Sequence, residues 1–325
     1  MKHRHRHRIT GEAATADEAG GSVPRLQAAA LLLMAVLLCS GGVAEAKKRP
    51  EGFGLSGLSV FVDAGLLVPS DRQSYFYDGR DERPNTIRRL MASPTYGEQI
   101  WNAIQNSDTP MSGVGSYSEI TIAEYPTMDF RLTYQIGLGI RYDYEAGWGW
   151  LLRFGYSRVT ATGQFLINRT PAAGAMTNQG NYVVCDMFGQ ENRIFIDLGF
   201  DKRLRLGGGF ELEIGAGVNV NNTKVQKQYM VVGGQVFSLL DVWGSNVVQV
   251  GAGSYEYQNQ GKLGIGFFGS AALCYVVNGV GSVDLGYTLY RTQTRYMGLD
   301  DADATALQHV VYLRMNLNNF SFFGG

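Results

Sequence analysis

Charged side chains recur at every second position along several otherwise apolar segments of the chain. Because the residues between them are large and apolar, the charges would share one face of each segment if the segment were extended. The charged residues placed on this face are Asp63, Asp129, Arg131, Arg141, Asp143, Arg153, Arg193, Asp197, Glu211, Glu213, Asp284 and Arg314. Carboxylates and guanidinium groups that are confined together pair with one another, since a buried charge without a partner costs several kcal/mol. We therefore expect a salt-bridged interior. The surplus of acids leaves a narrow, cation-preferring channel as the alternative.

The sequence offers few residues that could carry out catalysis or bind a metal ion. Downstream of residue 46 the only histidine is His309, and no serine lies two positions away on the same face of an extended segment. A Ser-His pair for nucleophilic catalysis is therefore not expected. Asp300, Asp301 and Asp303 form an acidic cluster, but it lacks the turn glycine of a calcium-binding loop. We predict no metal site and no cofactor.

The segment that alternates most clearly is 128–145. Apolar residues such as Ile136, Leu138 and Ile140 interleave there with polar residues and glycine, without a break. Such a strand has one face for lipid and one for a polar interior, as a transmembrane β-barrel requires. An all-β fold is predicted: an eight-stranded antiparallel transmembrane β-barrel with long extracellular loops.

Eight segments fit this pattern, and each is long enough to cross a bilayer at the usual tilt. They are 57–68, 128–145, 150–157, 192–202, 210–221, 262–277, 283–289 and 311–318. A basic turn from Arg203 to Gly208 is expected between the fourth and fifth. The connections alternate between long and short, which matches the long extracellular loops and short periplasmic turns of outer-membrane barrels.

The N-terminal 46 residues read as a secretory signal. A basic start precedes an apolar run from Ala28 to Leu38, and Ala44-Glu45-Ala46 fits a cleavage site for small residues. Residues 1–46 are thus predicted to be a removed signal peptide and residues 47–325 to form the barrel. The formal net charge of the whole chain is −1, so no strongly basic surface indicates nucleic acid.

In these alternating segments the chain resembles the small eight-stranded outer-membrane barrels of Gram-negative bacteria, the superfamily that holds the OmpA transmembrane domain, OmpX and OmpW. The resemblance rests on the alternation from Met128 to Glu145 and its counterparts, and covers nearly all of residues 47–325. It implies a protein of the bacterial outer membrane, surrounded by membrane lipid and lipopolysaccharide.

Two features of the loops carry further expectations. Residues 96–105 read as a helix with Ile100, Trp101 and Ile104 on one apolar stripe, packed on the barrel rim or on other loops. Residues 229–240 and 246–250 are β-prone and are expected to extend a hairpin above the membrane or to pair within the loop. Cys185 and Cys274 should lie at opposite ends of the barrel, too far apart for a disulfide.

Three functions are compatible with these residues. We expect a non-enzymatic barrel that acts structurally or binds a surface ligand, lipopolysaccharide, or a surface or periplasmic protein through its extracellular loops. The second is a narrow, porin-like pore for ions or small solutes. The third, a lipid-modifying enzyme, lacks the Ser-His pair that it would need.

Overall fold

The computed structural model describes residues 57–81, 85–105, 120–144, 147–169, 182–240, 247–251, 254–257, 260–277, 281–296 and 305–317. The predicted signal peptide (1–46) and the acidic cluster at 300–303 lie outside these ranges. Among the described residues, no helix has both the length and the hydrophobicity to cross a membrane.

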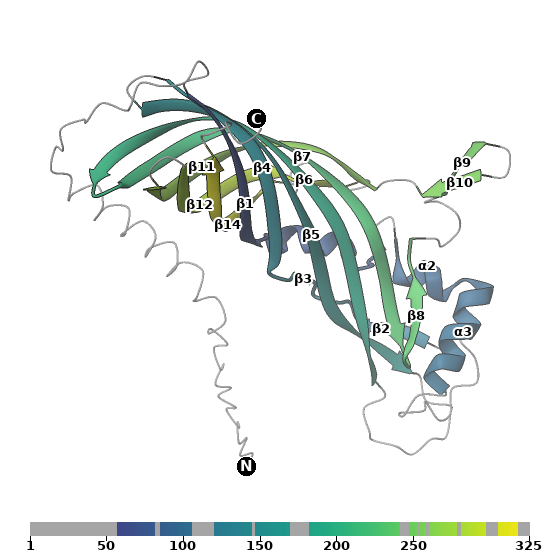
Figure 1. The fold of residues 1–325 in the computed structure, drawn as a ribbon. Helices are drawn as coiled ribbons and strands as arrows, with labels where there is room; N and C mark the ends of the chain where they lie inside the picture. The colour runs from purple at the N-terminus through teal and green to yellow at the C-terminus, as the bar shows by residue number, and fades with distance from the viewer. Residues whose placement is uncertain are drawn as a thin grey trace, which may run out of the picture. The chain divides into compact units, whose positions relative to one another are not determined.

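Eight strands form a closed antiparallel ring (Figure 1). In spatial order they are β1 (Leu58–Val68), β4 (Thr133–Asp143), β5 (Trp148–Arg169), β6 (Tyr182–Gly207), β7 (Phe210–Val232), β11 (Gly261–Val277), β12 (Gly281–Gln293) and β14 (Thr305–Leu317). Pairing of β14 with β1 closes the ring, with Asp63 opposite Arg314. The predicted eight-stranded antiparallel barrel is thereby confirmed.

Burial alternates along the strands of the ring, as the sequence pattern predicted. In β14, for example, Tyr312, Arg314 and Asn316 are buried, whereas Leu313 and Met315 expose half or more of their surface. The exposed side chains around the ring are mainly apolar and include Val62, Ile136, Leu138, Phe154, Leu198, Val218, Ile265, Phe267, Leu285 and Val311. We call this surface the apolar belt. A barrel with a polar interior and such a belt suits a hydrocarbon surrounding rather than water.

The strand predicted from 128 to 145 is interrupted. The structure contains a short β3 (Asp129–Phe130), then two residues outside any strand, then β4. Phe130 points inward and is buried, although the unbroken alternation had placed it outside with Leu132. The cause lies in loop one, the connection from Pro69 to Thr127. The Asp71 carboxylate accepts a hydrogen bond from the backbone N–H of Phe130 (2.9 Å), and Ser74 Oγ donates to the carbonyl of Met128. These contacts separate residues 128–130 from β4.

Three neighbouring strands are much longer than the sequence pattern indicated. Strands β5, β6 and β7 continue beyond the ends of the others as one projecting sheet (Figure 1). At the opposite end β6 also runs further, so that the predicted basic turn at Arg203 is wrong: Arg203 is a buried strand residue. The chain reverses at Gly207, Gly208 and Gly209, all of which have positive φ, a conformation that favours glycine.

Loop one folds into three short helices and a strand. They are η1 (Asp71–Tyr77), a 3-10 helix, α2 (Ile87–Met91), α3 (Pro94–Gln105) and β2 (Ile120–Glu124), which pairs with β5. Helix α3 confirms the predicted helix at 96–105: Ile100 and Ile104 are buried and Trp101 is half-buried, in one core with residues of the projecting sheet. One face of that sheet is therefore covered by loop one.

The remaining strands lie in the loops. Strand β8 (Gln235–Ser238) forms a hairpin with β7, while β9 (Val247–Gly251) and β10 (Ser254–Tyr257) form a separate two-stranded sheet. Strand β13 (Arg295–Tyr296) pairs with the start of β11. These pairings confirm that the β-prone residues 229–240 extend a hairpin and that residues 246–250 pair within the loop.

Candidate functional site

The interior of the ring is filled by charged and polar side chains in three layers. All but two of the charged residues predicted to face inward lie there, Asp143 half-buried and the others buried. Their partners lie on the same strand, on a neighbouring strand or across the ring. An eight-stranded barrel has room for such side chains and for little else. We name the layers by position. The turn layer surrounds Glu213 near Gly207–Gly209, the middle layer surrounds Arg153, and the loop layer surrounds Glu191 under loop one.

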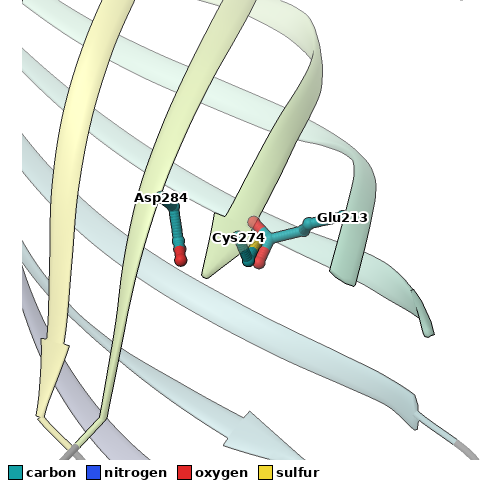
Figure 2. A group of neighbouring side chains, drawn as sticks. All are labelled: Glu213, Cys274 and Asp284. Atoms are coloured by element: carbon teal, nitrogen blue, oxygen red, sulfur yellow. The ribbon is translucent and has the colours of Figure 1, made fainter. Parts of the chain in front are cut away.

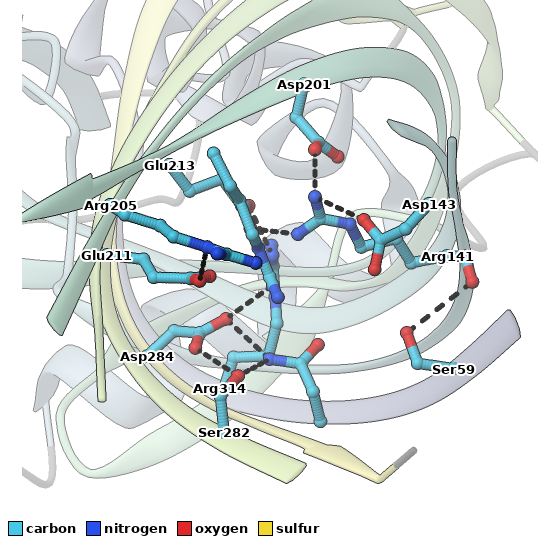
Figure 3. A network of polar contacts seen from close by, with 12 residues as sticks. Ser59, Arg141, Asp143, Asp201, Arg205, Glu211, Glu213, Ser282, Asp284 and Arg314 are labelled. Atoms are coloured by element: carbon cyan, nitrogen blue, oxygen red, sulfur yellow. Dashed lines mark hydrogen bonds and ion pairs between the residues drawn. The ribbon is translucent and has the colours of Figure 1, made fainter. Parts of the chain in front are cut away.

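Glu213 of β7 is the centre of the turn layer. Its carboxylate accepts from Arg141 Nη1 (2.5 Å), Arg203 Nε (2.9 Å) and Arg314 Nη1 (2.9 Å), which come from β4, β6 and β14 (Figure 3). Three guanidinium groups on one carboxylate would repel each other without further acids. Arg141 accordingly also pairs with Asp143 (2.8 Å) and with Asp201. The layer is a network of both signs that ties four strands together.

The same network continues to Asp284 of β12. Arg203 lies 3.5 Å from its carboxylate, which also accepts from Ser282 Oγ (2.7 Å) and from Asn316 Nδ2 (2.5 Å). Closer to the turns, Arg205 and Glu211 form a looser pair of 3.7 Å, in which the arginine is 38% exposed. Figure 3 shows this pair beside the network.

The turn layer also contains a group that could be considered for a metal ion. Ligand atoms of Glu213, Cys274 and Asp284 lie within 4.8 Å of one another, and Figure 2 shows the three side chains facing a common space. However, Glu213 already pairs with Arg203 and Arg314, and Asp284 already pairs with Arg203. A divalent cation would have to displace arginine from both, so the group fits ion pairing better than metal binding.

Arg153 of β5 organises the middle layer. Its guanidinium donates two hydrogen bonds to Asp63 (2.7 and 2.6 Å) and one to Asp197 (3.1 Å). Tyr290 on the opposite wall donates to the same Asp197 carboxylate (2.8 Å). Gly137 makes room for this arrangement, because a Cβ there would meet both Asp63 and Arg153. The bidentate pair and the Tyr290 hydroxyl join strands across the ring.

The loop layer is built around Glu191 of β6. Its carboxylate accepts from Arg193 Nε (2.5 Å), Tyr296 OH (2.9 Å) and Tyr77 OH (2.6 Å). Tyr77 belongs to η1, so loop one itself reaches into the barrel. Burial, followed by the facing Glu191 charge, raises the pKa of Tyr77 well above its usual value of about 10, so the phenol stays protonated and donates.

Apolar contacts complete the closure of this end. Phe76 stacks on Tyr296 with 4.4 Å between ring centroids, and Arg193 lies over the Phe130 ring at 5.0 Å. Phe76 and Tyr77 are fully buried. We call η1 with these contacts the plug. It covers the loop layer.

A second attachment holds loop one above the plug. The amide of Asn85 donates to both Gln228 and Gln260 (2.7 Å each), and Gln260 Nε2 donates back to Asn85 (3.1 Å). Ile87 and Leu90 of α2 follow and are fully buried. Residues on either side of the plug are thus fixed to the wall of the barrel.

The placement of Asp129 and Arg131 as lumen-lining residues is wrong. Both are exposed, and Arg131 Nε donates to Thr162 Oγ1 (3.3 Å) at the outside of β5. The reason is the interruption after β3: once Phe130 turns inward, its neighbours on either side face out. The other predicted residues, Asp63, Arg141, Asp143, Arg153, Arg193, Asp197, Glu211, Glu213, Asp284 and Arg314, all lie in the interior layers.

Several interior residues were missed from the sequence. Glu191 and Cys185 have the same inward parity as Arg193, and extending the alternation of β6 towards its start would have found them. Tyr77 carries no periodic signal, because a 3-10 helix in a loop follows neither a strand nor a long amphipathic helix pattern.

Cys185 and His309 lie apart from this network, whereas Cys274 lies in the turn layer beside Glu213 and Asp284. Cys185 and Cys274 are buried free thiols on different strands and in different layers, in agreement with the predicted absence of a disulfide between them. His309 faces outward, as its parity predicted, and its Nδ1 lies 2.6 Å from the hydroxyl of Tyr287.

Comparison with protein-family models and with curated proteins finds no match. Among solved structures the chain is similar to the Neisserial surface protein A, NspA (10% identity, TM-score 0.34, 81% of this chain and 98% of that chain). It is also similar to Ail, the attachment invasion locus protein of Yersinia pestis (9%, 0.29, 80% and 99%), and to the outer membrane protease OmpT of Escherichia coli (9%, 0.29, 61% and 67%). These similarities concern the fold and carry no argument about function.

Proposed function

We propose that this protein is a non-enzymatic β-barrel of the bacterial outer membrane that binds a partner protein with its projecting sheet and does not conduct solutes. The observation that carries the proposal is the filled interior. Three layers of paired charges occupy the ring, and the plug covers the loop end.

The apolar belt supports the location in a membrane. Its exposed side chains would meet water in a soluble protein, at a cost of roughly 25 cal/mol per Å² of apolar surface. Aromatic residues gather at the turn end of β4 and β5, where Tyr142 and Trp150 stack and Lys202 lies 4.9 Å from the Trp148 ring. Such aromatic residues suit the interface between hydrocarbon and headgroups.

The projecting sheet supports a role in binding. Its inner face packs on loop one, whereas its outer face presents Tyr182, Val184 and Val236, each more than half exposed. Beside them Phe188 and Tyr229 stack at 5.1 Å on the same outward parity. Aromatic and apolar side chains on a rigid sheet are typical of the centre of a protein interface. This surface is held by long strands, so it is already formed before a partner arrives.

Conductance in planar bilayers tests the closed interior. The wild-type protein should give no discrete steps in a bilayer where a known porin does. Steps that change in size in Arg153→Gln, which alters the middle layer, would establish a pore and contradict the proposal.

Photocrosslinking in intact cells tests the binding surface. A photoreactive residue in place of Val184, on the outer face, should give a discrete adduct with another protein. The same residue in place of Leu285, in the apolar belt of β12, serves as the control for random collisions. Absence of any adduct at Val184, Tyr182 and Val236 would remove this binding surface.

A further inference from the structure

A row of polar residues crosses the outside of three neighbouring strands where the apolar belt ends. Arg158 of β5 lies opposite Asn192 of β6, and Asn192 lies opposite Lys224 of β7. Arg158 and Lys224 are exposed and Asn192 is half-buried, all with outward parity. With about 4.8 Å between strands, the two cations stand roughly 10 Å apart.

A second row lies directly beyond the first. Thr160 faces Gln190, and Gln190 faces the exposed Lys227. Arg131 lies beside Thr160, because its backbone N–H donates to the Thr160 carbonyl (2.9 Å). The two rows on β5 to β7, together with Arg131 in the segment between β3 and β4, thus hold four cations, with amide and hydroxyl groups between them.

The first row adjoins the belt. Two residues before Arg158 along β5, Tyr156 is 37% exposed, and its partner Ile194 on β6 is 44% exposed. A two-residue step in a strand is about 6.6 Å. The cations therefore stand just beyond the side chains that would meet hydrocarbon, which is the depth of lipid phosphates.

These cations differ from the arginines of the interior in their pairing. In the interior every arginine of the three layers has a carboxylate within ion-pair distance. On the outer wall, among the residues that the structure describes, no ion pair involves Arg158, Lys224 or Lys227. Asp129, exposed and opposite Thr162, is the acid beside Arg131. The row carries a positive charge that the protein does not balance.

We propose that the outer wall of β5 to β7, with Arg131 beside it, binds a phosphorylated lipid of the outer leaflet. Its phosphates would pair with Arg158 and Lys224 and then with Arg131 and Lys227, while its acyl chains lie along Tyr156 and Ile194. Arg and Lys near an anionic lipid surface each contribute about 1 kcal/mol of binding. Asn192 and Gln190 can donate amide hydrogen bonds to phosphate oxygens between the cations. The proposal rests on the membrane location proposed above.

Lipid binding to the purified, detergent-folded protein tests the site. The probes are diphosphorylated lipid A and phosphatidylcholine in matched micelles, and binding is counted by native mass spectrometry. The wild type should retain lipid A over phosphatidylcholine. Arg158→Gln/Lys224→Gln should weaken lipid A binding roughly thirtyfold, since two cations are removed. Lys262→Gln/Arg291→Gln, which removes two exposed cations from the other wall, is the matched control and should change it by less than about threefold.

Three outcomes would overturn the proposal. The first is an equal loss of lipid A binding in both double variants, and the second is equal retention of the two lipids by the wild type. The third is displacement of lipid A by an equimolar soluble polyphosphate, which would make the row a site for soluble polyanions. Mobility of unboiled samples on gels is measured in parallel. If the wild type shows no compact, heat-modifiable form, the barrel proposal fails instead, so the two failures are distinguishable.

Discussion

The two ends of the barrel interior are closed in different ways. In the turn layer the partners of Glu213 all come from strands of the ring, so the barrel itself supplies every charge. In the loop layer the partners of Glu191 include Tyr77, which is delivered by a short helix far from the strand pattern. The turn layer is therefore as stable as the barrel, whereas the loop layer can open while the barrel persists.

The largest expected effect is at the turn layer. Glu213→Ala would leave Arg141, Arg203 and Arg314 buried with too few acids and should destabilise the barrel by about 3–5 kcal/mol. The measurement is the urea midpoint for loss of the compact, unboiled gel form. Glu211→Ala is the control, since its partner Arg205 is partly exposed and such pairs contribute about 0–1 kcal/mol. Equal effects of the two variants would refute the central role of Glu213.

A change at Gly189 should open the loop layer without unfolding the ring. A Cβ at this position would overlap the Tyr77 ring, so Gly189→Val should expel the plug. We expect rapid proteolysis within residues 71–91 with unchanged gel mobility of the barrel core. In Gly189→Val/Tyr77→Ala the clash is gone, so proteolysis within residues 71–91 should be slower than in Gly189→Val. A ring that unfolds together with the plug would show that the two ends are not independent.

Loss of a single hydroxyl should have a smaller effect. Tyr77→Phe removes one donor to Glu191 but keeps the aromatic side chain. Arg193 still neutralises the carboxylate, and Tyr296 still donates a hydrogen bond to it. The expected cost is about 1–2 kcal/mol, confined to opening of the plug. Hydrogen exchange of the backbone amides in η1 should accelerate, while exchange in β12 stays unchanged. Faster exchange in both would place Tyr77 in the global stability of the barrel.

The smallest expected effect is on the alkylation rate of the Cys185 thiol. Cys185 lies on β6 beyond the apolar belt, and burial together with the neighbouring Asp186 raises its pKa to about 12. At pH 8 the thiol is therefore neutral, and alkylation by iodoacetamide should be very slow, because the thiolate is the reactive form. The rate should rise in Gly189→Val, which loosens the core around the plug. Fast labelling in the wild type would contradict this picture of the loop end.

The difference between the strand-built turn layer and the loop layer, which needs a loop helix, also explains how much could be predicted from the sequence. Side chains alternate strictly in a strand, so Arg153, Asp197 and Arg314 could be assigned to the interior without knowledge of their partners. The number of strands followed in the same way. The choice of partners, such as Asp63 for Arg153, depends on register across the ring and could not be read from spacing alone.

The wrong predictions concern segments whose structure depends on contacts with a loop or on strands that continue beyond the apolar belt. Asp71 and Ser74 bind residues 128–130 and interrupt the alternation, and no local feature of 128–145 shows this. Likewise the lengths of β5 to β7 were underestimated, because polar residues beyond the end of the belt, such as Gln190 and Lys227, resemble the start of a loop. The outer basic rows lie in that misread stretch.

The glycine turn between β6 and β7 bears on the order of assembly. These two long strands are joined by the shortest connection between strands of the ring, so their pairing closes a small loop and loses little chain entropy. The pairing of β1 with β14 joins opposite ends of the chain and must wait for everything between them. We expect the β6–β7 hairpin to act as the template on which the neighbouring strands are added, with the β1–β14 seam as the last to seal.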